Sequence, residues 1–446
     1  MPAETEAGDR TDHAFGGFSL SAVSSPNPYF AVTLHWIGGL AAASFYLPFS
    51  RVRRWSWETY WLTAGFFSWI IAPLFFAVLL VPHFQRAFFD VSDKTLFWTY
   101  FFGVLWGLGG LTFGLTMRYL GIGLGMAIAL SYCAAFGTLV PPIVDGTITE
   151  MINHLWGWVT MAGILVCLLG IGLTGTAGHA KEQELSEEKR KAVVREFNFR
   201  KGILVATFSG IMSACFNFGY GGLKGFNFTQ VHGLTGNPIT LAAAAILRQH
   251  GQSITWDALP TVVVVLWGGF TANFIWCALL HLKNRSVRQY VGAACPPDEM
   301  LMAPTDDAVH DAMPEDPCAT AVVQRTTQRV PLLNNYTFSA IAGVTWYMQL
   351  FFYTAGQNFM PAALAFSGWT LHMASIIIFA TIWGVILHEW KGTSKRTHRL
   401  ITLGVCTLVL STIVVGAGNL IKSRTSAHVQ APVLNRGRIP PAKRGV

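Results

Sequence analysis

Long apolar runs alternate with short polar segments along almost the whole chain. About 20 apolar residues cross a bilayer as one α-helix, and only helices or closed barrels satisfy their backbone hydrogen bonds within it. The pattern therefore predicts an all-α integral membrane protein with ten transmembrane helices. The predicted spans are about 30–49, 59–81, 97–117, 119–144, 154–175, 202–221, 259–281, 335–356, 361–386 and 400–421.

The polar segments divide the spans into two halves of five helices. The first half covers residues 30–178 and the second covers 202–421, with a charged cytoplasmic linker at 179–201 between them. Within the second half, residues 290–330 contain acidic, Pro-containing patches that cannot bury a core, which predicts disorder there. A short surface helix is expected at 238–249.

Polar segments also stand at the two ends of the chain. Residues 1–29 form a polar extension, and residues 422–446 form a basic tail. The extension lacks a basic stretch followed by a short apolar core, which is the pattern of a cleaved signal peptide. We therefore expect the first apolar run to remain in the protein as a span.

Composition agrees with a membrane protein. The 446 residues are 52% hydrophobic and 12% charged, whereas soluble domains carry about 25% charged residues. A large soluble enzyme is therefore excluded. The seven Cys form no C-x-x-C pair, so neither a zinc site nor a disulfide framework is indicated.

The distribution of basic residues predicts the topology. The net charge is +8, but the basic residues lie in short clusters between apolar runs, which disfavours nucleic-acid binding. Loops after the odd-numbered spans carry 20 Lys and Arg, and loops after the even-numbered spans carry 4. Because basic loops stay in the cytoplasm, this asymmetry places both termini outside. The C-terminal tail, with six basic residues, is the exception.

A faint internal repeat relates the two halves. Gly, Ala and Phe recur at the same spacing within 39–45 and 210–216, and GVLW at 103–106 is echoed by GVTW at 343–346. Each echo relates span n to span n+5. Because five is odd, the second half must be inverted relative to the first. Inverted 5+5 repeats are typical of secondary transporters, with the substrate site between the halves.

Glycines in the third span lie on one helix face. Gly103, Gly107, Gly110 and Gly114 are spaced four, three and four residues apart. Small residues at this spacing let helices approach closely. We expect a helix-packing face here, whether static or sliding.

Few ionisable groups lie inside the predicted spans. His35 in the first span and His372 in the ninth are the two histidines placed deep within apolar runs, and Glu58 lies at the start of the second. Intramembrane ionisable residues are usually functional, and histidine titrates near neutral pH. These three residues are the candidates for proton coupling. The alternative is that each histidine is neutral and hydrogen-bonded to a neighbouring helix.

Aromatic and amide side chains are frequent within the spans. Aromatic faces pack on the C–H patches of sugars, and amides both donate and accept hydrogen bonds. The alternative is packing or interface anchoring, which is the usual role of membrane tryptophans. The candidates for substrate binding, two of which lie between the third and fourth spans, are Trp106, Arg118, Tyr119, Asn217, Trp346, Gln349, Tyr353, Gln357 and Trp369.

No enzyme signature is present: H-E-x-x-H, Walker A and nucleophile-elbow motifs are all missing. Instead, the strings at 39–61, 103–129 and 346–361, together with GWTLHM at 368–373 and GVILHEW at 384–390, resemble the L-rhamnose–proton symporter family. That family belongs to the drug/metabolite transporter superfamily. Glu58, Arg118 and His372 lie within these strings.

The resemblance implies ten helices, an inverted 5+5 repeat and proton-driven sugar uptake across a bacterial inner membrane. It implies a small sugar and membrane lipid as partners, and no cofactor or metal besides the coupling proton. The chain departs from the family at 364–366, where Leu-Ala-Phe replaces more polar residues. The alternatives are therefore a related transporter of another sugar or metabolite, and a membrane sensor that binds without transport. The sequence sets no oligomeric state.

Overall fold

The computed structural model describes residues 27–120, 148–184, 199–231, 234–292, 330–360, 368–386 and 393–436, with short pieces between 129 and 146. The described part is helical apart from one short hairpin. Six of its helical segments are long and apolar enough to cross a membrane. Most of the predicted fourth span and most of the predicted insert lie outside the described residues, as do residues 1–26 and 437–446.

The first half begins with a capped helix. The Asn27 side chain accepts a hydrogen bond from the backbone N–H of Phe30 (3.1 Å), and Pro28 takes the first helical position, where it loses no hydrogen bond. The elements of this half are α1 (Pro28–Ser44), η2 (Leu47–Arg51), α2 (Trp57–Phe66), η3 (Phe67–Ile71), α3 (Ala72–Leu80), α4 (Arg86–Phe89), α5 (Asp93–Leu120), α7 (Ile148–Asn153) and α8 (Leu155–Glu184).

The second half contains the surface helix expected at 238–249. That helix, α11, is capped by the Asn237 side chain, which accepts from the N–H of Ile239. The elements of this half are α10 (Phe199–Gly221), β1 (Thr229–Val231), β2 (Leu234–Gly236), α11 (Pro238–Gln249), η4 (Ile254–Trp256), α12 (Leu259–Asn284), η5 (Ser286–Val291), α14 (Leu332–Phe359), α15 (Gly368–Ile386) and α16 (Lys395–Arg436). The two strands pair antiparallel.

The second predicted span is interrupted. Residues 57–80 run as α2, a π-helical turn at 67–71 (η3), and α3. A π turn widens the helix by one residue and is frequent at functional sites. Here it carries Trp69, which is 5% exposed and lies in the core.

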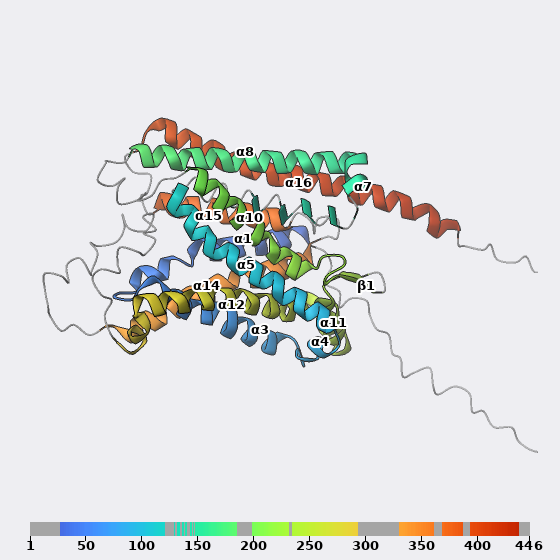
Figure 1. The fold of residues 1–446 in the computed structure, drawn as a ribbon. Helices are drawn as coiled ribbons and strands as arrows, with labels where there is room; N and C mark the ends of the chain where they lie inside the picture. Colours follow the sequence, from blue (N-terminus) through green and yellow to red (C-terminus); the bar gives the residue numbers. More distant parts are fainter. Residues whose placement is uncertain are drawn as a thin grey trace, which may run out of the picture.

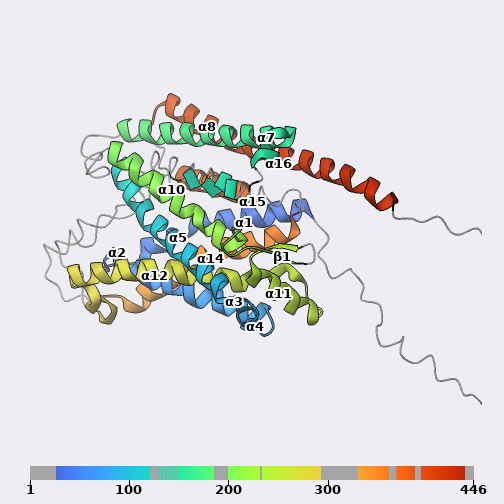
Figure 2. The same cartoon turned by 45° about the vertical axis from the view of Figure 1, so that its right-hand side comes forward.

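The helices form a central group and a separate pair. In the central group α1 packs on α14 and α15, α5 packs on α10 and α12, and α2 contacts α12 and α14. Helices α8 and α16 lie side by side along one flank (Figure 1), and the turned view keeps them together (Figure 2). They run antiparallel, since Thr174 lies beside Gly404 and Thr160 beside Gly418.

The closest helix approaches occur at glycines. A Cβ on Gly39 would collide with Ser375 of α15, and one on Gly210 would collide with Tyr132. Similarly, a Cβ on Gly103 would collide with the carbonyl oxygen of Val265 in α12. A Cβ on Gly343 would collide with the carbonyl oxygen of Ala64 in α2.

The predicted glycine stripe of α5 is only partly used for packing. Gly103 and Gly107 face α12, where Gly107 lies against Gly269. A Cβ built on Gly110 or Gly114 would meet no atom within 4 Å in the described part of the chain.

Different elements meet at the two ends of the central group. At one end, the start of α1, the end of α14 and the start of α12 meet, and Asn27 N–H donates to the carbonyl of Phe359 (3.0 Å). Asp257 lies here, so we call it the Asp257 end. At the other, the Glu58 end, the start of α2 meets η5 and the end of α12.

Candidate functional site

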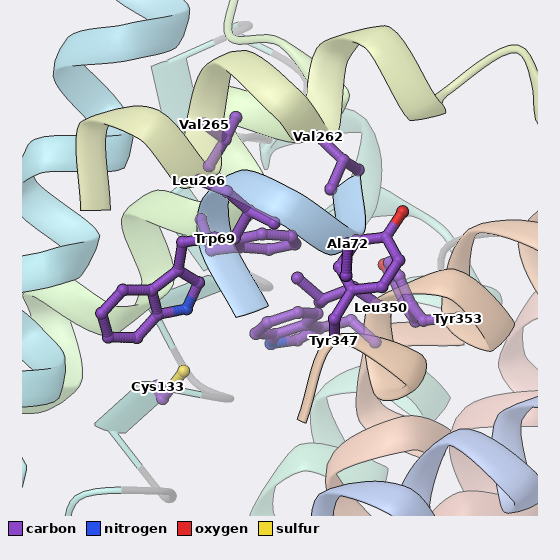
Figure 3. Packing of buried hydrophobic residues seen from close by; sticks show 11 residues of the cluster. Trp69, Ala72, Cys133, Val262, Val265, Leu266, Tyr347, Leu350 and Tyr353 are labelled. Carbon is purple, nitrogen blue, oxygen red and sulfur yellow. The ribbon is translucent and has the colours of Figure 1, made fainter. Parts of the chain in front are cut away.

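Three tryptophans from different helices meet at the centre of the bundle. Trp106 of α5 and Trp346 of α14 have ring centroids 5.7 Å apart, and Trp69 of the π turn lies 5.7 Å from Trp346 and 6.3 Å from Trp106. The sequence echo predicted that Trp106 and Trp346 occupy equivalent positions, and the structure brings the two into contact. The close-up of this core includes Trp69, Tyr347 and Tyr353 (Figure 3).

A second layer of aromatic rings continues from the tryptophans. Phe216 lies 5.6 Å from Trp106 and stacks on Trp369 at 5.9 Å. Tyr353 lies 5.8 Å from Trp369 and 5.6 Å from Tyr220. Four candidates named from the sequence, Trp106, Trp346, Tyr353 and Trp369, are therefore brought together in one cluster.

The two candidate histidines lie next to this cluster. His35 and His372 are 0% and 1% exposed, and their ring centroids are 6.2 Å apart. Tyr353 contacts both rings, at 5.4 Å from His35 and 5.2 Å from His372. Gly356 leaves room for the His35 ring and Gly38 for the His372 ring, because a Cβ at either glycine would press within 3.2 Å of the imidazole.

Several polar atoms of this centre are buried without a protein hydrogen-bond partner in the described part of the chain. They are both ring nitrogens of His35 and His372, Nε1 of Trp69 and Trp369, and Oε1 of Gln357. A buried polar group left unpaired costs about 1–3 kcal/mol. The centre therefore offers unsatisfied donors and acceptors within an aromatic wall, which suits a polyhydroxy ligand with apolar faces.

The space beside the tryptophans is small in this conformation. A cavity of about 10 Å³ is bordered by Trp61, Trp69 and Trp346, which is about the room that one water needs. A ligand several times larger than a water could enter only if the helices around this cavity separate.

The amide candidates take different positions. The Gln357 Nε2 donates to the Tyr353 hydroxyl (3.0 Å), so Gln357 belongs to the centre. Asn217 of α10 donates to the carbonyl of Gly137 (3.3 Å). Gln349 is buried in α14, at the level where the backbone of α14 meets Gly38 of α1.

The last two candidates lie at the end of α5. Tyr119 is half-buried there. Arg118 lies in the same helix, but its side chain is outside the described part of the structure, as are residues 364–366.

Glu58 lies apart from the histidines, at the start of α2. It is 3% exposed and accepts hydrogen bonds from the Ser286 hydroxyl and from Asn284 Nδ2 (3.1 Å). Ser286 Oγ in turn lies 2.7 Å from His281 Nδ1, and His281 Nε2 lies 3.1 Å from the Tyr290 hydroxyl. Glu58 thus ends a chain of hydrogen bonds that joins α2, α12 and η5.

One buried carboxylate was not recognised from the sequence. Asp257, between η4 and α12, is 7% exposed and accepts a hydrogen bond from Asn358 Nδ2 (2.9 Å). Its local sequence, SITWD, reads as a polar loop before an apolar run. The burial comes from Asn358 of α14 and neighbouring helices, so no local signal indicated it.

The described residues contain no group of three or more His, Cys, Asp and Glu side chains that could hold a metal ion. What they contain is a set of membrane-crossing helices around a buried centre of tryptophans, tyrosines and two histidines. This arrangement is typical of a multi-pass membrane transporter whose substrate site lies between its helices.

Comparison with known proteins agrees with this class. The family model described as L-rhamnose-proton symport protein (RhaT) matches residues 27–298 and 322–421. The L-rhamnose-proton symporter of Shigella sonnei is 33% identical over 386 residues, which are 86% of this chain and 96% of the relative. The symporter of Escherichia coli (strain SMS-3-5 / SECEC) is 32% identical over the same shares. The chain belongs to the L-rhamnose-proton symporter family, which is a family of transporters and not of enzymes.

Proposed function

We propose that this protein imports L-rhamnose, or a closely related 6-deoxyhexose, together with a proton across a bacterial inner membrane. Family membership supports the reaction class, and the relatives carry L-rhamnose in their names. The observation that carries the site is the buried centre, where unpaired polar atoms of His35, His372 and Trp369 lie against aromatic rings. Sugar hydroxyls would pair with these atoms, and the apolar face of the deoxyhexose would pack on the rings.

The proposal includes an inverted 5+5 repeat. Helix contacts support it. Helix α1 (first span) packs on α14 (eighth span), and α10 (sixth span) packs on α5 (third span). Replacing each span by the one five positions away in the other half converts the first pair into the second. The glycine contacts follow the same exchange. Gly103 approaches the seventh span at Val265, whereas Gly343, its echo, approaches the second span at Ala64. Two structurally similar halves of opposite orientation would rock about the central site and expose it alternately to each side.

The orientation in the membrane follows from the basic loops. Arg51 and Arg53 lie in the segment that contacts the start of α14 through Asn334 and Asn335, and Lys283 and Arg288 lie at the same end of the bundle. This is the Glu58 end. Because basic loops remain in the cytoplasm, the Glu58 end faces inside and the Asp257 end faces outside, with both termini.

A proton supplies enough free energy for accumulation. One charge that crosses about 100 mV releases about 2.3 kcal/mol. At about 1.4 kcal/mol for each tenfold ratio, this sustains a sugar gradient of about 40-fold. The His35–His372 pair is our candidate for the group that holds the proton, since an imidazole nitrogen can bind and release one.

The reaction is tested with purified protein in proteoliposomes. An inward proton gradient should drive accumulation of L-rhamnose, with fucose, xylose and glucose as competing substrates. A protein that binds the sugar without gradient-driven flux would be a sensor and would overturn the proposal. Uptake of another of these sugars in place of rhamnose would correct the substrate alone.

The histidine assignment is tested by His372→Ala. We expect the accumulation ratio to fall from about 40-fold to about 1, because the neutral alanine can hold no proton. The matched control is His398→Ala, since His398 is exposed near the start of α16 and does not belong to the buried centre. Accumulation by His372→Ala equal to that of the control would contradict the assignment.

A further inference from the structure

Asp257 is a buried carboxylate that the proposed function does not yet use. Besides the bond from Asn358, its carboxylate accepts from the backbone N–H of Ala258. The charged or titratable groups that interact with it electrostatically are Arg248 of α11 and the phenol of Tyr220 of α10. It therefore lies where α10, α11, α12 and α14 meet at the Asp257 end.

A purely structural role explains the position of Asp257 only in part. A carboxylate just before α12 is stabilised by the helix N-terminus. An Asn side chain would accept the same backbone hydrogen bond equally well, and it would avoid the cost of burying a charged group. The structural role thus accounts for a short polar side chain here, but it does not require an ionisable one.

Two tyrosines, Tyr220 and Tyr353, lie between this carboxylate and the histidine pair. Tyr220, which interacts with Asp257, has its ring 5.6 Å from that of Tyr353. Tyr353 in turn contacts both His35 and His372. Since Gln357 donates to the Tyr353 oxygen, the hydroxyl proton of Tyr353 remains free to be donated. A phenol can give up one proton while its oxygen accepts another.

We propose that Asp257 is a proton-binding residue of the transport reaction, and that it loads the coupling proton at the outer end. The carboxylate takes a proton from external water. The transfer requires hydrogen bonds that form as the helices separate: Asp257 then gives the proton to the oxygen of Tyr220 as that hydroxyl gives its own proton to Tyr353, which likewise protonates an imidazole nitrogen of the histidine pair. One proton has then moved inward, both phenols are neutral again, and Asp257 is again a carboxylate. This inference rests on the proposed proton-coupled uptake.

The test is Asp257→Asn in the full-length protein, reconstituted in proteoliposomes. This change keeps the size of the side chain and the acceptor for Ala258 N–H, but it removes the site that binds a proton. Three quantities are measured with L-rhamnose: accumulation driven by a proton gradient, sugar-dependent alkalinisation of the external medium, and exchange of labelled for unlabelled sugar without a gradient. The matched control is Asp90→Asn, because Asp90 is exposed and follows α4 at the same end.

We expect Asp257→Asn to reduce the accumulation ratio from about 40-fold to about 1 and to abolish alkalinisation. Exchange should stay within about twofold of the parent, since the sugar site at the centre is intact. Tyr220→Phe, which keeps the ring and removes the hydroxyl, should slow alkalinisation in the same direction.

Two results would overturn the inference. Normal accumulation by Asp257→Asn would show that no proton binds there. Loss of exchange together with accumulation would assign Asp257 to folding or sugar binding instead. If the parent protein itself shows no proton-driven uptake, the proposed function fails, and that result is obtained without any variant.

Discussion

Helix α12 has a buried carboxylate at each end, and the two are held differently. Asp257, just before its start, accepts from one side-chain amide and one backbone N–H, and it interacts with Tyr220, which leads to the centre. Glu58, at the other end, accepts from Asn284, the last residue of α12, and from Ser286, which begins η5. In the described part of the chain these two are the buried carboxylates.

The surroundings of the two carboxylates differ in where their contacts lead: those of Glu58 stay at one end of the bundle, and those of Asp257 continue toward the centre. The hydrogen bonds of Glu58 continue through Ser286 to His281 and Tyr290 and stay at that end of the bundle. Because the Ser286 hydroxyl donates to Glu58, its oxygen accepts from His281 Nδ1–H. Such a network holds α2 to the end of α12 and favours one geometry. Asp257 also has two hydrogen-bond donors, but from Tyr220 ring contacts continue inward to Tyr353 and the histidine pair.

The length of α12 keeps the two carboxylates apart. A helix of 26 residues extends about 39 Å, which exceeds the hydrocarbon core of about 30 Å. The two groups thus lie near opposite faces of the membrane.

The largest effect on stability is expected for Glu58→Ala. The Ser286 hydroxyl and the Asn284 amide would both lose their acceptor while Ser286 stays buried, which should lower the free energy of unfolding by about 3 kcal/mol. Denaturant titration of the detergent-solubilised protein measures this, and Asp257→Asn should leave the same quantity nearly unchanged. If Glu58→Ala is as stable as the parent but loses proton coupling, then Glu58 carries the proton and does not serve mainly to hold the helices together.

A smaller loss is expected for Ser286→Ala. The change removes the link between Glu58 and His281 and leaves His281 Nδ1 without its partner, at a cost of about 1–2 kcal/mol. Ser339→Ala is the matched control, since the Ser339 hydroxyl is buried in α14 without a partner among the described residues. Its removal should be neutral or slightly stabilising. Equal unfolding free energies for the two variants would mean that the network does not fix the Glu58 end.

Sequence patterns indicated the helices and the members of the centre, but not how they meet. Hydropathy predicted the positions of α1, α5, α10 and α12 because each side chain contributes locally to a membrane-crossing run. The π turn at 67–71 was not predicted, since its extra residue leaves the apolar pattern unchanged.

Long-range packing explains what the sequence could not indicate. His35 and His372 were each named from local hydropathy, yet their contact depends on how α1 packs on α15 at Gly39 and Ser375. The echo of GVLW and GVTW predicted that Trp106 and Trp346 occupy equivalent positions, but it did not predict that their rings meet, as they do. Asp257 was missed because residues of α10 and α14, distant in the chain, bury it.

The smallest effect is expected for a third carboxylate, Glu184, which is exposed at the end of α8 outside the membrane-crossing part. Hydrogen bonds from the hydroxyl and backbone N–H of Ser394, and from the hydroxyl of Thr397, lower the pKa of Glu184 below its ordinary value of 4.5. A lowered folded-state pKa contributes stability above the ordinary value, and this contribution is lost as the pH falls through the folded-state pKa.

Glu184→Gln should therefore lower the unfolding temperature slightly at pH 7, and the difference from the parent should shrink toward zero on acidification. Transport should not change, because this carboxylate joins only α8 to the start of α16. Scanning calorimetry or intrinsic fluorescence from pH 7 to about pH 3 measures the trend. A difference that grows on acidification would contradict the stabilising role of these hydrogen bonds. A transport defect as large as that of Asp257→Asn would show that an exposed carboxylate far from the centre also affects transport, which would contradict the distinction drawn for Asp257.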